Sequence, residues 1–469
     1  MLPQKRLAIL TAILIMGFAV SVSAAEKSES AKPDPQIEKA LKEVSAKQLE
    51  ASITKLVSFG TRLTVSTNLP PESGRGVLAA RDWLRAEFES YSKACGGCLE
   101  VKVQTFTEGV SARIPQPTEL NNVYAILRGS DPESAKRIIV IDGHYDSIAM
   151  ARMTDPAADA PGANDDGSGT ALTLEAARVL SKYKFPATIV FAIFDAEEQG
   201  LFGSKGFAKM AKAEGWNIEA VLSNDIVGGD KNPGQDPKVV RIFSESIPAT
   251  AVDDKAAIGE IRLVGLENDS PSRQIARYLV ETSEEYACAG SVRGKMIYRQ
   301  DRYLRGGDHT SFNQQGFAAV RMTEWREDYA HQHEVVRTEN GIQYGDLLKF
   351  VDFNYLAGVT RLNIAAAASL ASAPAPPVQV RIDAKKLDND TTLTWQASPD
   401  GKVDHYEVVM RDTTSPVWER SKDAGTATTI TLPESKDNTL FGVCAVDAQG
   451  HRSLVVIPVR EGRKQERKE

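Results

Sequence analysis

The chain has 469 residues, of which 42% are hydrophobic and 25% are charged. This composition is ordinary for a soluble globular protein, and the length allows more than one domain. The formal net charge of −7 argues against nucleic acid and anionic membrane surfaces as partners, because both repel an acidic protein.

The first 24 residues have the three parts of a secretory signal peptide. A basic start with Lys5 and Arg6 precedes an apolar run over 7–20, and Val22 and Ala24 occupy the small-residue positions before a cleavage site. No later segment approaches the roughly 20 apolar residues that a membrane span needs. We therefore expect an exported protein, periplasmic or secreted, with no integral membrane segment after signal cleavage.

The next part of the chain shows the pattern of an α/β domain. Apolar residues at helical spacing predict helices at 38–58 and 74–91. Alternating apolar residues predict strands at 99–106 and 122–127. Strands and helices then alternate through 137–365, as in a sheet covered by helices.

Four cysteines are present in a chain expected to reach a compartment that permits disulfides. Cys95 and Cys98 are three residues apart, and no second Cys pair or nearby His completes a zinc site. We therefore expect a local disulfide between them. Cys288 and Cys444 are expected to be buried thiols.

The composition changes at 371–377, an Ala- and Pro-rich run typical of a linker, which would end a domain over 25–370. Residues 378–460 lose the helical pattern and predict a small all-β sandwich, and 461–469 form a charged tail. The five predicted strands of the sandwich are 378–382, 391–396, 405–411, 428–432 and 440–446.

The predicted sandwich resembles a fibronectin type III module. The resemblance rests on Trp395, Tyr406 and Val408 at core positions and on the run 445–453 near the end. No Tyr stands in the segment before Phe441, where that family usually keeps one. Such a domain suggests contact with a surface or a polymer.

Candidate ligands and acid–base groups recur where predicted strands end. Glu197 and Glu198 follow the apolar run 187–193, at the rim where open α/β sheets bind ligands. Adjacent residues on an extended chain point in different directions, so one carboxylate can hold a metal while the other handles a proton. Each candidate alone has an ordinary explanation as a cap, turn or loop residue, but together they are the residue types that bind zinc. The other candidates are His144, Asp146, Asp165, Asp225, His309, His331 and His333.

Residues 48–365 resemble the M28 family of zinc aminopeptidases in the order and spacing of their motifs. The resemblance implies a mixed central sheet flanked by helices, of the zinc exopeptidase type, and a site with two Zn²⁺ per chain. The matching pieces are His144-x-Asp146, the Gly-Ala-Asn-Asp-Asp-Gly-Ser-Gly turn at 162–169, the Glu-Glu-x-Gly-Leu-x-Gly-Ser stretch at 197–204, the strand before Asp225, and Asp308-His309 before Ser311-Phe312.

The resemblance also implies a role for each site residue. Glu197 would be the general base, and Asp146 would accept the second ring N–H of His144. The peptide between Asp165 and Asp166 would be cis, and Asp195 has no assigned role. The implied zinc ligands are Asp165, which bridges both ions, His144 and Asp225 on one ion, and Glu198 on the other. Candidate pocket residues, each equally explained as packing or surface residues, are Tyr298, Tyr303, Asp308, His309 and Glu324.

The last zinc ligand is where this sequence departs from the family. Many relatives supply it from a His-Thr-x-x-Asp-Thr run, and the nearest match here is 333–338, with Arg337 where Asp is usual. We expect His333 to be the ligand, with His331 as the alternative.

The predicted function is hydrolysis of N-terminal residues from peptides with free N-termini. Two metal ions would activate a water, and Glu197 would move its proton. One alternative is another zinc exopeptidase chemistry on the same fold, a carboxypeptidase or a glutaminyl cyclase; the cyclases lack the first His ligand, so His144 argues against them. Another is a non-catalytic binding protein that retains the fold, against which the near-complete ligand set argues.

Overall fold

The computed structural model describes residues 33–229 and 231–461, so the predicted signal peptide and nearly all of the charged tail lie outside the described residues. Its centre is an eight-stranded mixed sheet with the order β1-β2-β4-β3-β5-β8-β6-β7, as the resemblance implied. Strands β4, β3, β5 and β8 are neighbours and run parallel to one another. The strands are β1 (Leu99–Glu108), β2 (Thr118–Leu127), β3 (Arg137–His144), β4 (Thr188–Phe194), β5 (Asn217–Asn224), β6 (Val239–Ser244), β7 (Arg293–Ile297) and β8 (Ala319–Glu324).

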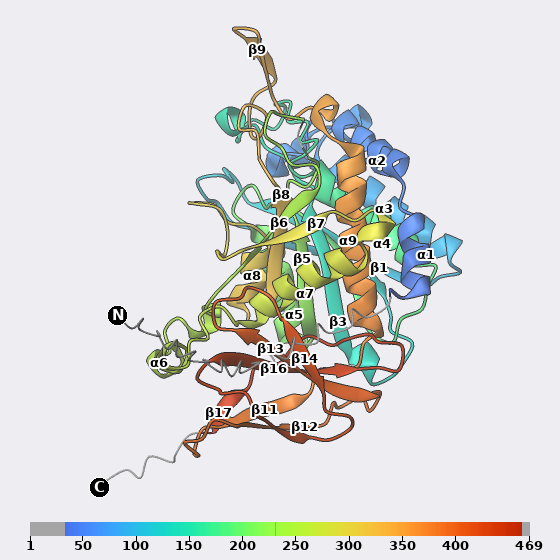
Figure 1. The fold of residues 1–469 in the computed structure, drawn as a ribbon. Helices are drawn as coiled ribbons and strands as arrows, with labels where there is room; N and C mark the ends of the chain where they lie inside the picture. The colour runs from blue at the N-terminus through green and yellow to red at the C-terminus, as the bar shows by residue number, and fades with distance from the viewer. Residues whose placement is uncertain (1–32, 230, 462–469) are drawn as a thin grey trace, which may run out of the picture.

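Helices cover both faces of this sheet, because the inner strands are apolar on both sides (Figure 1). One core cluster joins the sheet to α1–α4, α7 and α9, and a second joins its other face to α5 and α8. The helices are α1 (Pro35–Lys42), α2 (Ala46–Ser58), α3 (Val77–Ala94), α4 (Gly167–Leu180), α5 (Phe202–Ala213), α6 (Lys255–Leu263), α7 (Pro271–Glu285), α8 (His309–Gln314) and α9 (Phe353–Ser372).

The predicted helix at 38–58 is wrong in one respect, because the structure has two helices there. Helix α1 ends at Lys42, and α2 begins after Ser45, whose side chain accepts a hydrogen bond from the Gln48 backbone N–H. A serine in this position stabilises a helix start, so the chain turns although the apolar stripe continues on both sides. The second predicted helix, 74–91, is α3, shifted by three residues.

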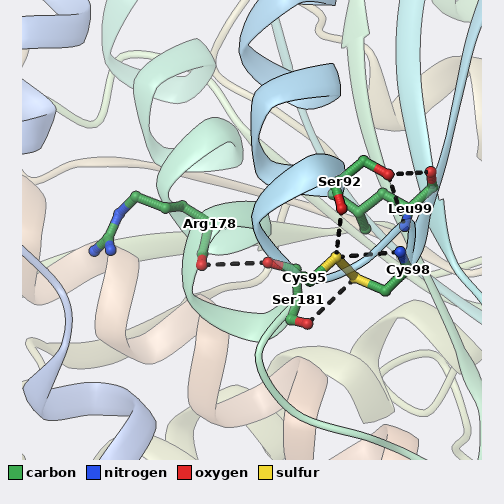
Figure 2. The surroundings of a disulfide bond; sticks show 6 residues. All are labelled: Ser92, Cys95, Cys98, Leu99, Arg178 and Ser181. Carbon is green, nitrogen blue, oxygen red and sulfur yellow. Dashed lines mark hydrogen bonds between the residues drawn. A yellow bond between two sulfur atoms is a disulfide. The ribbon is translucent and has the colours of Figure 1, made fainter.

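The predicted disulfide between Cys95 and Cys98 is confirmed. Figure 2 shows that it lies where the end of α3 meets the start of β1, beside the hydrogen bond from the Ser92 hydroxyl to the Leu99 carbonyl, 2.8 Å long. Cys444 is buried as expected. The expectation of burial is wrong for Cys288, which is exposed in the short 3-10 helix Ala287–Ala289 that follows α7.

The C-terminal part folds into two small sheets with a shared apolar core. The sheets have the orders β15-β12-β11-β17 and β14-β13-β16, and the rings of Trp395 and Tyr406 meet between them with centroids 5.6 Å apart. Five strands match the predicted ones, whereas β14 and β17 are short and were not predicted. The fibronectin type III resemblance stays a prediction. The strands are β11 (Val378–Asp383), β12 (Thr391–Gln396), β13 (His405–Asp412), β14 (Arg420–Asp423), β15 (Thr429–Leu432), β16 (Thr439–Val446) and β17 (Val459–Glu461).

The β-sandwich packs against the end of the central sheet where the parallel strands begin (Figure 1). Arg137, the first residue of β3, donates a hydrogen bond to the Ala373 carbonyl, and the Ala375 N–H donates to Asp400 of the sandwich. The expected linker at 371–377 begins inside α9, and Ala373 and Ala375 are buried. The two domains therefore meet through a packed connection.

A two-stranded hairpin projects at the opposite end of the molecule from the sandwich (Figure 1). Its strands are β9 (Arg337–Glu339) and β10 (Ile342–Tyr344), joined by Asn340 and Gly341 with φ of 49° and 77°. Asn-Gly in this conformation is a favoured turn for a two-residue hairpin. Among the described residues, no helix has the length and apolar character needed to cross a membrane.

Candidate metal centre

Three parallel strand ends bring the predicted site residues to one edge of the sheet. His144 is the last residue of β3, the Glu197–Glu198 pair follows β4, and Asp225 follows β5. Strands β4, β3 and β5 are adjacent, so these ends lie side by side. The carboxyl edge of parallel strands is the usual place for a ligand site in an open α/β sheet.

The first group of ligand atoms belongs to His144, Glu197 and Asp225, all within 4.8 Å of one another. The Nε2 atom of His144 lies 3.9 Å from Oδ1 of Asp225, and both atoms are buried without a hydrogen-bond partner. The second oxygen of Asp225 is held 2.9 Å from the buried Arg321 guanidinium. One imidazole nitrogen and one carboxylate oxygen are thus left facing each other.

The second group contains Asp165, Glu198 and His333. The Nε2 atom of His333 lies 2.8 Å from Oδ2 of Asp165 and 3.2 Å from Oε1 of Glu198, and that Glu198 oxygen has no hydrogen-bond partner. His333 has a φ of 60°, which L-residues adopt only at a cost, so its position is imposed by the surrounding structure.

Asp165, a member of the second group, also faces the first. Its Oδ1 is 3.4 Å from Nε2 of His144, while its Oδ2 is 2.8 Å from Nε2 of His333. Among the described residues, no lysine or arginine lies within ion-pairing distance of Asp165, Glu197 or Glu198. Buried carboxylates without a cation are costly unless a metal neutralises them, so these residues fit two divalent ions.

Asp146 holds both the first histidine and the Glu197–Glu198 turn. Nδ1 of His144 lies 3.2 Å from the Asp146 backbone carbonyl and 3.3 Å from Oδ1 of the Asp146 carboxylate, on the far side of the ring from Asp165. The two carboxylate oxygens of Asp146 also accept hydrogen bonds from the backbone N–H groups of Glu197 and Glu198, both 3.1 Å long. The carboxylate therefore lies where a partner for the second ring N–H was expected, and it also orients the acidic pair.

Glu197 is the least enclosed carboxylate of the site. Burial raises the pKa of its carboxyl group well above the ordinary value, and the neighbouring Asp225 and Glu198 carboxylates add to this effect while His144 opposes it. Bound divalent cations would favour the ionised form. Asp195, two residues earlier, accepts hydrogen bonds from the Asn121 N–H and the Tyr145 hydroxyl, in keeping with a structural role.

Asp346 is a site residue that the sequence analysis missed. Its carboxylate accepts hydrogen bonds from the backbone N–H groups of Asn164, at 2.9 Å, and Asp165, at 2.7 Å. It is the first aspartate after His333, and the β9–β10 hairpin separates the two. Arg337, which stands where the family pattern has Asp, lies on this hairpin and pairs with Glu334 and Glu339. The Asn340-Gly341 pair is a turn signal that could have revealed the hairpin.

Asp166 and Arg62 fix the turn that presents Asp165, and neither role was foreseen. Asp166 caps α4 through the Gly169 N–H, 2.8 Å away, and accepts the His144 backbone N–H at 3.1 Å. The peptide between Asp165 and Asp166 is cis, as the resemblance implied. Arg62 is fully buried and donates to carbonyls of the adjoining loops, and burial lowers its pKa to about 10.

The remaining histidine candidates lie outside both groups. His331, the alternative last ligand, stacks on Phe350 with ring centroids 3.6 Å apart. His309 is buried, and its Nε2 lies 2.8 Å from the Gln300 carbonyl. His333 therefore lies in the candidate metal centre, whereas His331 and His309 lie outside it.

The candidate pocket residues differ in exposure. Tyr298 and Tyr303 are exposed, whereas Asp308 and Glu324 are buried. Glu324 accepts a hydrogen bond from the Asn164 side chain, 3.0 Å long, so it supports the turn before Asp165. Oδ1 of Asp308 has no hydrogen-bond partner.

Comparisons with known proteins agree with this geometry. The family model described as "Peptidase family M28" matches residues 122–335. A "Probable zinc metalloprotease" of Pyrenophora tritici-repentis is 45% identical, covering 91% of this chain and 87% of the relative, and one of Leptosphaeria maculans is 44% identical, covering 91% and 97%. The crystal structure of the Legionella pneumophila LapA aminopeptidase shares the fold, with a TM-score of 0.50 and 20% identity over 74% of this chain and 78% of that chain. High identity over nearly the whole length leaves one conclusion: this chain belongs to the zinc metalloproteases of peptidase family M28.

Proposed function

We propose that the protein is an aminopeptidase that removes N-terminal residues from peptides and uses two zinc ions. The observation that carries the proposal is the position of Asp165, whose two oxygens face two separate ligand groups. A shared carboxylate of this kind suits a pair of metal ions. We assign His144 and Asp225 to one ion, and Glu198 and His333 to the other.

The residues of the chain divide the chemistry between them. When bound, zinc polarises the scissile carbonyl and lowers the pKa of water. Glu197 takes a proton from the attacking water and passes it to the leaving amine, as a general base and then a general acid. Asp146 keeps Nδ1 of His144 engaged, so that Nε2 stays available as a ligand, and its hydrogen bond to the Glu197 N–H fixes the base.

The residues of the site favour recognition of a free amine. Asp165 and Glu198 are assigned to zinc, so a free amine would bind to one of the ions, and Glu197 is the carboxylate of the two groups that this assignment leaves for its proton. A terminal carboxylate needs an available cation, but Arg321 is fully buried against Asp225 and the Gly306 carbonyl, and the partly exposed Arg113 donates a hydrogen bond to the Glu198 carbonyl. We therefore favour aminopeptidase over carboxypeptidase action.

A panel of free and N-blocked aminoacyl substrates tests the proposal, run with chelator and with zinc added back. Only free-amine substrates should be cleaved, and only with zinc present. Glu197→Gln should lower kcat by roughly 10²- to 10⁴-fold, the usual contribution of a general base, while zinc content measured by mass spectrometry stays unchanged. Glu334→Gln, an exposed neighbour of His333, is the matched control and should keep full activity.

Several outcomes would overturn the proposal. Cleavage of blocked peptides from the C-terminus would indicate a carboxypeptidase, and cyclisation of N-terminal glutamine would indicate a glutaminyl cyclase. No turnover of any substrate with two zinc ions bound would favour a binding protein.

We also propose that the protein is exported. The predicted signal peptide motivates this, and the Cys95–Cys98 disulfide supports it, because such bonds persist in oxidising compartments. N-terminal sequencing of protein from the native host should begin at Ala25. A mature chain that begins at Met1 would contradict the proposal.

A further inference from the structure

Exposed apolar side chains are concentrated around the metal centre. Of the thirteen large apolar side chains that are exposed among the described residues, seven lie in segments near the site. The other six lie near α6, on the β-sandwich or, as Tyr298 does, beside Arg273 of α7 near the sandwich interface. Six of the seven form what we call the apolar rim: Val110, Tyr303, Leu304, Tyr329, Val336 and Ile342.

The loops of the apolar rim are bound directly to the ligand residues. In the β1–β2 loop, Arg113 donates a 2.6 Å hydrogen bond to the Glu198 carbonyl. In the loop after β7, the Gly306 carbonyl accepts a hydrogen bond from Arg321, which contacts Asp225. Val336 lies three residues after His333. The rim is therefore continuous with the site.

The same loops are also bound to one another. Arg302 pairs with Glu327 at 2.6 Å, which links the loop carrying Tyr303 to the loop carrying Tyr329. The Gly345 N–H donates to the Ala330 carbonyl, which links the base of the hairpin to that second loop. Three of the segments that carry the apolar rim are thus connected to one another, and the β1–β2 loop with Val110 is connected to the site through Glu198.

Leu304 is exposed to solvent in an unfavourable backbone conformation. It is fully exposed, with a relative accessibility of 104%, and its φ of 57° is uncommon for a leucine. Arg299 stacks on the ring of the neighbouring Tyr303, 3.9 Å from its centroid, and steadies this loop. An apolar side chain held outward by a strained backbone points to a binding role.

We propose that the apolar rim binds apolar side chains of a peptide substrate beyond its N-terminal residue, so that the protein prefers hydrophobic peptides of several residues. Asp165 and Glu198 are only 6% and 4% exposed, so a peptide whose N-terminus reaches them must run outward across the surrounding loops. Burial of apolar surface there would add affinity without touching the reacting bond. This inference rests on the proposed aminopeptidase function for the direction of the peptide.

Point substitutions test the rim better than removal of the hairpin, which would disturb His333 and Asp346. The variant Leu304→Asn/Ile342→Thr removes apolar surface, yet Asn tolerates the backbone of position 304 and Thr suits the strand at position 342. The matched control is Leu387→Asn, a leucine on the β-sandwich that is 100% exposed. Three substrates share one N-terminal residue: a chromogenic aminoacyl amide, a pentapeptide with apolar residues at positions 2–5, and a pentapeptide with Ser and Gly there.

We expect the double variant to lose about tenfold in kcat/KM on the apolar pentapeptide, through a higher KM. Its activity on the amide and on the polar pentapeptide should match that of the wild type, and the control should be unchanged throughout. An equal loss on all three substrates, or no loss on the apolar pentapeptide, would overturn the proposal. So would a wild-type dimer that the double variant converts to monomer at unchanged peptide KM, because the rim would then be a subunit contact.

A binding measurement separates this proposal from the proposed function. Glu197→Gln with zinc bound should bind the apolar pentapeptide more tightly than the polar one in a calorimetric titration, and the added rim substitutions should abolish the difference. That result would support the rim even if no substrate were hydrolysed by the wild type. Equal affinities for the two pentapeptides would overturn it.

Discussion

The two ends of the central sheet both bury several charges, but they neutralise them differently. At the sandwich interface, Asp269 is buried between two arginines: Arg411 donates hydrogen bonds of 2.9 and 2.7 Å, and Arg277 lies 3.0 Å away. At the metal centre, Asp165 and Glu198 face histidines and other carboxylates. One end carries arginines as counter-charges in the chain, whereas the carboxylates of the other end face histidines, an arrangement that suits a bound cation.

Asp225 is intermediate between these cases. One of its oxygens is paired with Arg321 and the other faces His144 with no hydrogen-bond partner. The general lesson is that burial alone does not mark a carboxylate as functional. A buried carboxylate that has no lysine or arginine partner in the chain is a better sign of function, because a bound ion or ligand must compensate its charge.

The largest effect that follows from this comparison is expected for Asp165→Asn. The substitution keeps the shape of the side chain but removes the charge shared by the two ligand groups. Zinc content should fall from about two to below one per chain, and kcat/KM should fall by more than about a thousandfold. Asp159 is an exposed aspartate in a loop near the site, so Asp159→Asn is the control and should retain the zinc content and the kcat/KM of the wild type. Full zinc content in Asp165→Asn would show that Asp165 does not bridge two ions.

The next effect concerns the other end of the sheet. Asp269→Ala leaves Arg277 and Arg411 buried without a counter-charge, so the free energy of unfolding should fall by about 3–5 kcal/mol. Zinc content and kcat should not change, because the site lies at the opposite edge. Urea unfolding measures the free energy of unfolding. Mass spectrometry measures the zinc content, and steady-state kinetics measure kcat.

The interface offers its own control for this experiment. Glu260→Ala breaks a pair with Arg460 that is about one-third exposed on both sides, and it should cost less than about 1 kcal/mol. A similar loss of stability for Asp269→Ala and Glu260→Ala would show that burial does not distinguish the two pairs.

Much of the candidate metal centre could be located from the sequence because its residues end strands of strongly apolar sequence. His144, Glu197 and Asp225 follow runs whose pattern indicates buried parallel strands, and adjacent parallel strands must end at one edge. Asp346 could not be found in this way. It follows the β9–β10 hairpin and not a strand of the central sheet, and its contact with the Asp165 N–H depends on the folded loop.

The sandwich interface could not be predicted for a related reason. Asp269 lies 142 residues from Arg411 in the sequence, and nothing in either local pattern distinguishes it from a surface pair. The sandwich strands themselves were recognised from alternation, but alternation indicates which side of a strand is buried in its own domain and not which other domain covers it. Short strands such as β14 carry too few residues to show the pattern at all.

The smallest expected effect concerns a third set of carboxylates, partly buried at the cavity of about 320 Å³ between α7 and the sandwich. Burial raises the pKa of Glu281 and of Glu285 from 4.5 to about 7, with Arg452 opposing both shifts. His451, which faces the same cavity, has a raised pKa because its ion pairs with Asp447 and Asp34 outweigh the effect of burial.

All three groups give stability the same dependence on pH. The folded state binds more protons than the unfolded state between about pH 4.5 and 7, so the contribution of the two glutamates is lost as the pH rises through that window. The contribution of His451 is complete below its unfolded pKa of 6.5 and is likewise lost on raising the pH. The interface should therefore weaken toward alkaline pH.

The variant Glu281→Gln/Glu285→Gln isolates the glutamates, because Gln resembles the protonated acid at every pH. Its free energy of unfolding should equal that of the wild type near about pH 4 and exceed it by about 2 kcal/mol near about pH 8, a figure reduced for partial solvent exposure. Urea unfolding across this range provides the measurement, with Glu284→Gln, an exposed glutamate on the same helix, as the control. A constant difference at all pH values would mean that the glutamates do not titrate in the folded protein. In that case they would be ionised like Asp269, with their counter-charges supplied by the arginines of the interface.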